Sequence, residues 1–271
     1  MTVVSEASAN VCPGAGPSLS GVILTLNEEK HIEACIDSLR WTDKVVVLDS
    51  GSEDSTQQLA EMAGATVVVH PFENYAQQRN VALSRVRSDW VLFVDADERA
   101  TPELAVETRA VIAERPETGW WIPRFNYIMG HRMRATGWYP DYQMRLLRRD
   151  AAHYDPARGV HELVKLAGDA GYMASHLIHY NYETLSQFWA KQRRYLQYDI
   201  DVLLASGAQP KFHSPYTQAL RHMWWRFVTL EGWRDTVWGL LLSALMGYYE
   251  LLKYREVRRA RRMHATGEEA S

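Results

Sequence analysis

Residues 90–98 read WVLFVDADE, an unbroken apolar stretch that ends in three carboxylates within four positions. The apolar part has the length and composition of a strand buried on both faces of a sheet. Three similar stretches precede it, GVILTL at 21–26, KVVVLD at 44–49 and ATVVVH at 65–70, and helical patterns separate them. This alternation predicts a parallel α/β sheet over residues 20–115.

The rest of the chain divides into three parts by pattern. Residues 1–19 are small, polar and rich in Pro and Gly, which predicts a flexible tail and no signal peptide. Residues 116–182 hold short strand-like pieces separated by turns, which predicts an antiparallel extension of the sheet. Residues 183–264 have helical periodicity in three segments, near 183–205, 215–230 and 233–262. We therefore expect one α/β domain over 20–182, followed by a C-terminal helical segment.

Composition narrows the class of protein. The 271 residues are 46% hydrophobic and 23% charged, with a formal net charge of −3, which is typical of a globular protein. This charge argues against a nucleic-acid binder that relies on global positive charge. Cys12 and Cys35 are too few for a disulfide framework, which fits a reducing, cytoplasmic setting. The sequence contains no run of about 18 apolar residues, so we expect no simple membrane span.

Polar side chains follow three of the four predicted strands, at the edge where parallel sheets bind ligands. Asp95 and Asp97 follow the fourth strand, and two hard oxygen ligands one residue apart suit Mg²⁺ or Mn²⁺ with a diphosphate. Asp49 can accept hydrogen bonds from a base or ribose, and Gly51 allows close backbone approach. Asn27 follows the first strand. Taken singly, each has an ordinary alternative, namely a solvated acidic turn, a strand–turn–helix connection or a helix cap.

Taken together, the three strand ends resemble glycosyltransferase family 2, whose members have the GT-A fold. The match runs from Gly21 to about Glu98, through TLNEE, VVVLDSGSEDST, AQQRNVAL and VLFVDADE. In that family Asp95-Ala96-Asp97 corresponds to the DXD motif. The resemblance implies a UDP-sugar donor, a divalent cation (Mg²⁺ or Mn²⁺) and a direct, inverting displacement. It also implies site roles by position: Thr25, Asn27 and Glu28 near the nucleotide, Asp49 and Gly51 near the base, Arg79 and Asn80 near the donor, Asp95 near the ribose or the metal, and Asp97 on the metal.

The middle of the chain resembles a bacterial branch of the family. WIPR at 121–124, GWYPD at 137–141, RLLRR at 145–149 and VHE at 160–162 carry this resemblance. The branch contains lipopolysaccharide core β-1,4-glucosyltransferases, so the resemblance implies transfer of a hexose, glucose above others, to a saccharide of an envelope glycolipid. Residues 20–115 would then form the nucleotide-sugar-binding half and 116–182 the acceptor half.

Transfer must deprotonate an acceptor hydroxyl, which requires a positioned general base. We predict Asp141 as that base, because Gly137 and Pro140 shape its loop, with Glu162 as the alternative. His161 is a candidate metal ligand, since neutral imidazole suits Mn²⁺. Arg145 and Arg148 are candidates for pairing with the diphosphate. A turn aspartate, a structural histidine and a charged strand face are the ordinary alternatives.

The C-terminal segment contains an apolar stretch, VWGLLLSALMGYYELL at 237–252, that is too short to span a bilayer comfortably. Tryptophans precede it, and six basic residues follow it between Lys253 and Arg262. Trp and Arg beside an apolar helix suit the headgroups of an anionic membrane. We expect a peripheral protein at the inner face of the cytoplasmic membrane, while a helix packed on the catalytic domain and a dimer interface remain alternatives.

Other function classes fit the strand ends less well. A nucleotidyltransferase usually has a Gly-rich basic loop after the first strand, whereas TLNEEK is acidic and lacks glycine. A catalytically inactive scaffold of the same fold is disfavoured by the retained Asp49, Asp95 and Asp97. A Rossmann dehydrogenase or a P-loop enzyme would need a glycine motif that is missing after the first strand. The sugar, the acceptor hydroxyl and the oligomeric state stay open.

Overall fold

A computed structural model describes residues 16–156, 164–207, 210–211 and 213–266. The chain divides into two compact units. The first contains the chain up to residue 121 together with residues 144–175, and the second contains 122–143 and the chain from 176 onward. The boundary expected at residue 182 stays a prediction.

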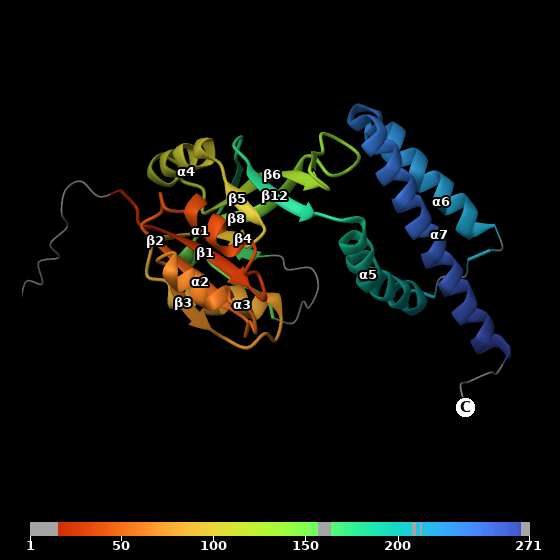
Figure 1. The fold of residues 1–271 in the computed structure, drawn as a ribbon, viewed down its shortest axis with the longest axis horizontal. Coiled ribbons are helices and arrows are strands. Elements are labelled where there is room, and N and C mark those ends of the chain that lie inside the picture. The colour runs from red at the N-terminus through yellow and green to blue at the C-terminus, as the bar shows by residue number, and fades with distance from the viewer. Residues whose placement is uncertain (1–15, 157–163, 208–209, 212, 267–271) are drawn as a thin grey trace, which may run out of the picture. The chain divides into compact units, whose positions relative to one another are not determined.

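The first unit is built on four parallel strands, in the spatial order β3-β2-β1-β4 (Figure 1). Their bounds are β1 (Leu19–Thr25), β2 (Lys44–Asp49), β3 (Thr66–Val69) and β4 (Trp90–Asp95). The predicted parallel sheet is therefore confirmed. Its register aligns Thr25 with Asp49 and Leu24 with Asp95, so the three predicted strand ends lie level at one edge.

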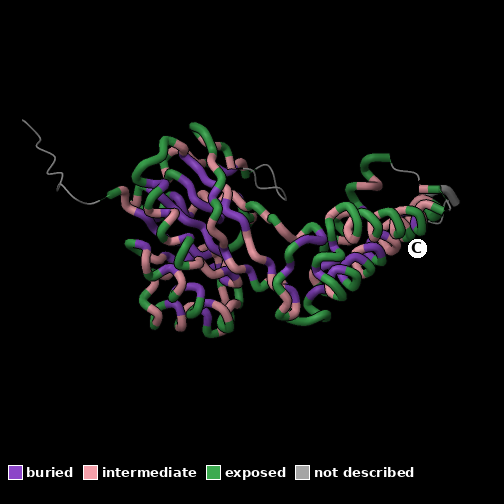
Figure 2. The backbone as a smooth tube through the Cα atoms, turned by 90° about the horizontal axis from the view of Figure 1, so that it is seen from above, coloured by how far each residue is buried: buried purple, intermediate pink, exposed green. Residues whose placement is uncertain are grey.

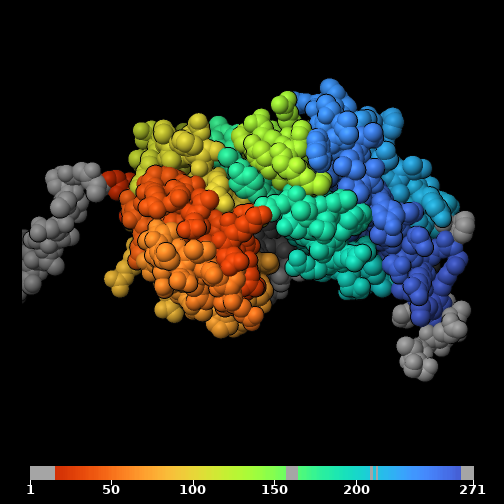
Figure 3. Space-filling model, in the orientation of Figure 1, coloured from red at the N-terminus to blue at the C-terminus, as the bar shows by residue number. Residues whose placement is uncertain are grey.

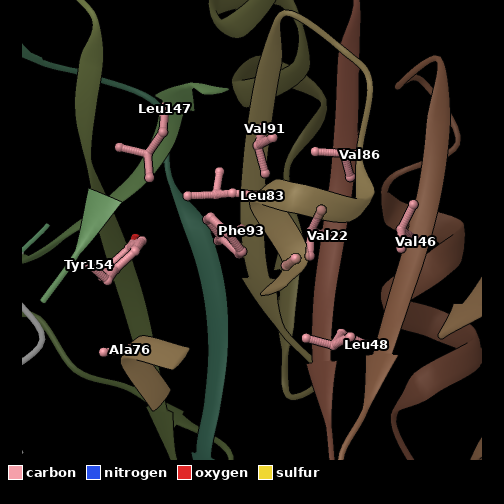
Figure 4. Close-up of a cluster of buried hydrophobic side chains, with 11 residues drawn as sticks. Val22, Val46, Leu48, Ala76, Leu83, Val86, Val91, Phe93, Leu147 and Tyr154 are labelled. Carbon is pink, nitrogen blue, oxygen red and sulfur yellow. The ribbon is translucent and has the colours of Figure 1, made fainter. Parts of the chain in front are cut away.

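Helices connect these strands as the sequence patterns predict. They are α1 (Ile32–Ser38), α2 (Thr56–Met62), α3 (Tyr75–Arg85) and α4 (Pro102–Glu114). Asn74 caps α3 by accepting a hydrogen bond from the Gln77 amide, and Thr101 caps α4 in the same way before a proline at its first position. The strands are largely buried (Figure 2). Their apolar side chains, with Phe93 near the centre, pack against Leu83, Leu147 and Tyr154 (Figure 4).

Beyond β4 the sheet extension is mixed rather than antiparallel throughout. The strand β8 (Asp141–Arg148) pairs antiparallel with β4, as expected. The long strand β6 (Gly119–Ile128), however, pairs parallel with β11 (Ala170–Tyr172) and β12 (Leu177–Tyr182). Parallel pairing is possible because each connection from β6 is long enough for a crossover. The remaining short elements are β5 (Glu98–Ala100), β7 (His131–Arg132), η1 (Arg149–Ala151), β9 (Ala152–Tyr154) and β10 (Val164–Leu166).

Helices dominate the second unit, close to the predicted ranges. They are α5 (Leu185–Ala205), α6 (Ser214–Trp224), the π-helical η2 (Trp225–Thr229), the 3-10 helix η3 (Gly232–Asp235) and α7 (Thr236–Thr266). Phe188 of α5 and Leu242 of α7 pack with Ile128, Met133 and Tyr182 in one buried cluster. Within the described ranges, none of the helices combines the length and apolarity that crossing a membrane requires.

Candidate functional site

The carboxylate of Asp49 organises the loop after β2. It is buried and accepts hydrogen bonds from the Gly51 amide (2.9 Å), the Ser52 amide (2.8 Å), the Thr25 hydroxyl (3.0 Å) and the Gln57 side-chain amide (2.7 Å). Burial alone would raise the pKa of Asp49, but these hydrogen bonds outweigh it and lower the pKa below its usual range. Gly51 has a φ of +96°, in the left-handed region that glycine adopts without strain. The loop is thus held by an ionised side chain.

The loop after β1 is joined to this second loop. The Asn27 amide donates to the Ser52 hydroxyl (2.8 Å), and the Asn27 side chain accepts from the Glu53 amide (2.9 Å). The Glu28 amide donates to the Thr56 hydroxyl (2.8 Å). The structure therefore brings together the five residues expected near the nucleotide and base at the first two strand ends.

Two arginines meet the carboxylate of Asp95 at the end of β4. Arg145 of β8 donates from Nη1 (3.0 Å) and from Nη2, which makes a bidentate pair. The Nη2 atom of Arg79 in α3 lies 3.9 Å from Asp95 Oδ1. The Arg79 guanidinium also lies over the rings of Phe93 and Tyr154, at 5.0 and 5.7 Å from their centroids. The two donor-side predictions, Arg79 and Asp95, are thus neighbours.

Glu98, to which the sequence analysis gave no role, is central to this arrangement. It is fully buried, accepts from Arg145 Nη2 (2.8 Å) and accepts from the backbone amide of Asp95 (2.9 Å). Burial disfavours the charged form of Arg145, but Asp95 and Glu98 outweigh it and raise the Arg145 pKa. Residues 95–98 form what we call the acidic turn. Arg145 therefore holds the acidic turn in place in this structure, whereas the sequence predicted a contact with phosphate. The only sequence signal for Glu98 was its place directly after the Asp95-Ala96-Asp97 motif.

The acidic turn fits a divalent cation. The pKa of Glu28 is raised to about 7, first by burial and then by the charges of Asp97, Asp54 and Asp95. Asp97, Asp54 and Asp95 thus place negative charge near Glu28, which a bound cation would offset. Among the described residues, no three His, Cys, Asp or Glu side chains form a preformed metal-binding group.

Other predicted donor-side residues lie elsewhere or are used differently. The side-chain amide of Asn80 donates to the Tyr154 carbonyl (2.7 Å) and accepts from the Tyr154 amide (2.9 Å), which ties α3 to β9. Arg148 pairs with Trp90, at the opposite end of β4 from Asp95. Trp90 and Asp95 are five residue steps apart, or about 17 Å along the strand, which places Arg148 too far away to contact a diphosphate at Asp95. The candidate metal ligand His161 and the alternative base Glu162 lie outside the described residues.

Asp141, the predicted base, lies in the second unit at the start of β8. One carboxylate oxygen accepts from Arg124 Nε (3.0 Å), Arg124 Nη2 (2.6 Å) and the Asn126 side-chain amide (3.0 Å). The other oxygen accepts from the Gln143 side chain (2.9 Å). Burial would raise the pKa of Asp141, but the Arg124 charge and these hydrogen bonds lower it. Asp141 is therefore ionised at neutral pH, and its basicity is reduced by its partners.

The loop that leads into Asp141 is held by the C-terminal helical segment. The buried carboxylate of Asp235 accepts from the amides of Arg134 (2.7 Å) and Ala135 (3.0 Å) and from the Thr136 hydroxyl (2.8 Å). Arg226 donates to the Thr136 carbonyl (2.7 Å). Sequence analysis missed this clamp, because the partners are about 100 positions apart along the chain. A lone aspartate before an apolar helix is the only local signal.

Comparisons with known proteins relate this chain to glycosyltransferases. The family model "Glycosyl transferase family 2" matches residues 20–154. The lipopolysaccharide core biosynthesis glycosyltransferase LpsC of Rhizobium meliloti (strain 1021) is 30% identical over 202 residues, which are 72% of this chain and 75% of that protein. An uncharacterized glycosyltransferase of Rickettsia bellii (strain RML369-C) is 28% identical over 257 residues, 88% of this chain and 86% of its own. Among solved structures, glucosyl-3-phosphoglycerate synthase from Mycobacterium tuberculosis with Mn²⁺, UDP and glucosyl-3-phosphoglycerate has a TM-score of 0.47 at 20% identity, covering 73% of this chain and 82% of its own.

Proposed function

Because this chain belongs to glycosyltransferase family 2 and has the GT-A fold, we propose that it transfers a hexose from a UDP-sugar to a saccharide acceptor of a bacterial envelope glycolipid. Glucose is the proposed hexose, and lipopolysaccharide core is the proposed acceptor. The Rhizobium relative, a lipopolysaccharide core biosynthesis glycosyltransferase, supports this acceptor class. The observation that carries the proposal is the acidic turn at 95–98, which lies level with Asp49 at one sheet edge.

In the donor half, the loops after β1 and β2 would receive the nucleotide. The Asp49 carboxylate keeps the second loop in place through four neighbours, so the backbone there is preorganised for a base or ribose. Asp97 and Asp95 would hold the cation, Mg²⁺ or Mn²⁺. When bound, the cation neutralises charge on the departing UDP. Arg79 lies beside Asp95, where its charge would also face the diphosphate.

In the acceptor half, Asp141 is the proposed general base of a single inverting displacement, with Glu162 as the alternative. Asp141 is held ionised by Arg124, so it can accept the hydroxyl proton without first losing one of its own. Its lowered pKa fits proton transfer late in the reaction, when the acceptor oxygen has already become acidic by bonding to the sugar. No covalent sugar–enzyme intermediate is needed for this route.

Nucleotide release from a panel of UDP-, GDP- and TDP-hexoses, with Mn²⁺, Mg²⁺ or EDTA, tests the class and the donor. We expect cation-dependent release of UDP from one UDP-hexose. Asp97→Asn should lower that release at least 100-fold, because a site electrostatic group typically contributes about 2.7–4 kcal/mol. Asp150→Asn is the matched control, since Asp150 is 80% exposed and lies far along the chain from the acidic turn. Release from no nucleotide sugar would contradict the proposal.

A further inference from the structure

One face of α7 is apolar in its first half and basic in its second. Val237, Leu241 and Tyr248 are 76%, 39% and 49% exposed, and Arg255, Arg259 and Arg262 are exposed farther along. At 3.6 residues per turn, these six positions fall within an arc of about 60°, so they form one line along the helix. We call this line the α7 face.

The acidic residues of α7 lie off this face. Glu250 is buried and bonded to Lys253 (2.6 Å), and Glu256 lies about 60° around the helix from the edge of the face, where it pairs with Arg259 (3.9 Å). From residue 253 to 262 the helix has six basic residues and one acidic residue. The second half of the face is therefore strongly positive, and the first half has no charged side chain.

A second exposed apolar stripe lies on α6. Tyr216, Leu220 and Trp224 are spaced four residues apart and are 57%, 69% and 66% exposed. The helices α6 and α7 run antiparallel and side by side (Figure 1, Figure 3), with Gly247 against Ala219. On each helix the exposed apolar stripe lies about 100° around from that contact, in the direction that brings both stripes to the same side of the pair. Exposed apolar patches of this kind mark interaction surfaces.

We propose that the α7 face, with the adjoining α6 stripe, docks on an anionic lipid surface. Apolar side chains with Trp at the headgroup level, continued by arginines that meet lipid phosphates, are the pattern of a helix lying in the plane of a membrane interface. A second copy of this chain fits less well, because the arginines would lie in the seam between two helices, where parallel pairing sets like charges against each other. The charge of the face thus favours lipid.

This inference rests on the proposed function, and it links the docking surface to the loop that precedes the proposed base. Trp225 and Trp233 are exposed beside Arg226 and Asp235, the two residues that clamp the loop before Asp141. The segment that joins the α6 stripe to the α7 face along the chain therefore also holds the acceptor loop. An acceptor saccharide attached to a lipid would be presented at the same surface.

Cosedimentation of the full-length protein with sucrose-loaded vesicles tests the proposal. The vesicles are phosphatidylcholine alone or with phosphatidylglycerol. We expect binding to the anionic vesicles that weakens as NaCl rises. Arg255→Gln with Arg259→Gln should weaken binding about 25-fold, from about fivefold for each charge removed. Val237→Glu should abolish it. The matched controls are Arg40→Gln and Val106→Glu, whose side chains are about as exposed but lie in the first unit.

The readouts separate this proposal from the proposed activity. Cation-dependent UDP release without vesicles should be unchanged in the Val237 and Arg255/Arg259 variants, which also checks that they fold. Loss of binding by those variants, and not by the controls, supports the docking surface even if no donor is turned over. Equal binding to neutral vesicles, or equal loss in the controls, would overturn it. A dimer that Val237→Glu converts to monomer, with no vesicle binding, would instead assign the face to a second copy.

Discussion

Removing Arg145 should destabilise the first unit strongly. Its guanidinium is 3% exposed and donates to Asp95 and Glu98, and Glu98 is fully buried. Arg145→Met keeps most of the side-chain volume but leaves the Glu98 carboxylate without its counterion. Breaking a buried pair from one side costs about 3–5 kcal/mol, because a buried charge is left uncompensated. Surface pairs contribute only about 0–1 kcal/mol, so a matched control is available.

That control is Arg109→Met. Arg109 also donates to a carboxylate, Asp43 (2.8 Å), but its side chain is 37% exposed. We expect the Arg109→Met substitution to lower the free energy of unfolding by less than about 1 kcal/mol. Urea denaturation followed by circular dichroism, with the first unit's transition analysed by itself, measures both free energies of unfolding.

The double-mutant cycle with Glu98→Gln is the sharper test. Glu98→Gln alone should cost about 1.5–3 kcal/mol, since it weakens a charge-assisted hydrogen bond. In the double variant the uncompensated carboxylate is gone, so Arg145→Met should cost at least about 1 kcal/mol less than in the wild-type background. Additive losses, or a loss below 1 kcal/mol for Arg145→Met, would refute the reasoning that Arg145 braces the acidic turn through Glu98.

Three further predictions concern charge at the two sites. Glu28 has a pKa of about 7 in the folded protein, against 4.5 ordinarily. Between these values the folded state keeps a proton that the unfolded state loses, so the free energy of unfolding should fall as the pH rises from about 4.5 to 7. Glu28→Gln should remove this slope and gain about 1–2 kcal/mol at pH 8 after allowance for solvent screening, as urea titrations at several pH values would measure. Asp141→Asn should lower transfer by about 10²–10⁴-fold while UDP binding by calorimetry stays within a factor of two; full turnover would remove Asp141 from the base role. Asp235→Asn should cost about 1.5–3 kcal/mol in the second unit by urea denaturation, and it should lower transfer more than cation-dependent UDP release, because the acceptor loop loses its clamp.

The sequence was sufficient for the parallel sheet because its signals are local. The strands at 44–49 and 90–95 were predicted with the bounds that the structure has, since each is an uninterrupted apolar run that stops at a carboxylate. Thr101 and Pro102, at the start of the helix Pro102–Glu114, are local signals of the same kind, because the Thr101 side chain caps the first turn and proline fits the first helical position. The direction of β12 beside β6 could not be obtained in this way, because nothing local specifies which distant strand becomes a neighbour.

The candidate site likewise has features that the sequence predicts and features that it does not. Which carboxylates end the strands was visible in the sequence, and so was their common edge. What each charged group binds was not. Arg145, predicted for phosphate, binds Asp95 and Glu98, and Arg148, three residues farther along the same strand, lies at the other end of β4. Such pairing depends on the register between β4 and β8, which only the folded sheet fixes.

The charges on the acidic turn explain which of its carboxylates is suited to the cation. Asp95 and Glu98 face Arg145, so their charge is largely compensated by a guanidinium that the two carboxylates keep protonated despite its burial. After burial, Asp97 is the largest contribution that raises the pKa of Glu28, so it lies on the side of the turn near Glu28. Because Arg145 already donates to both carboxylate oxygens of Asp95, we expect a divalent ion to depend more on Asp97 than on Asp95. Isothermal titration with Mn²⁺ and UDP should then show a larger loss for Asp97→Asn than for Asp95→Asn, and the reverse order would refute this division of roles.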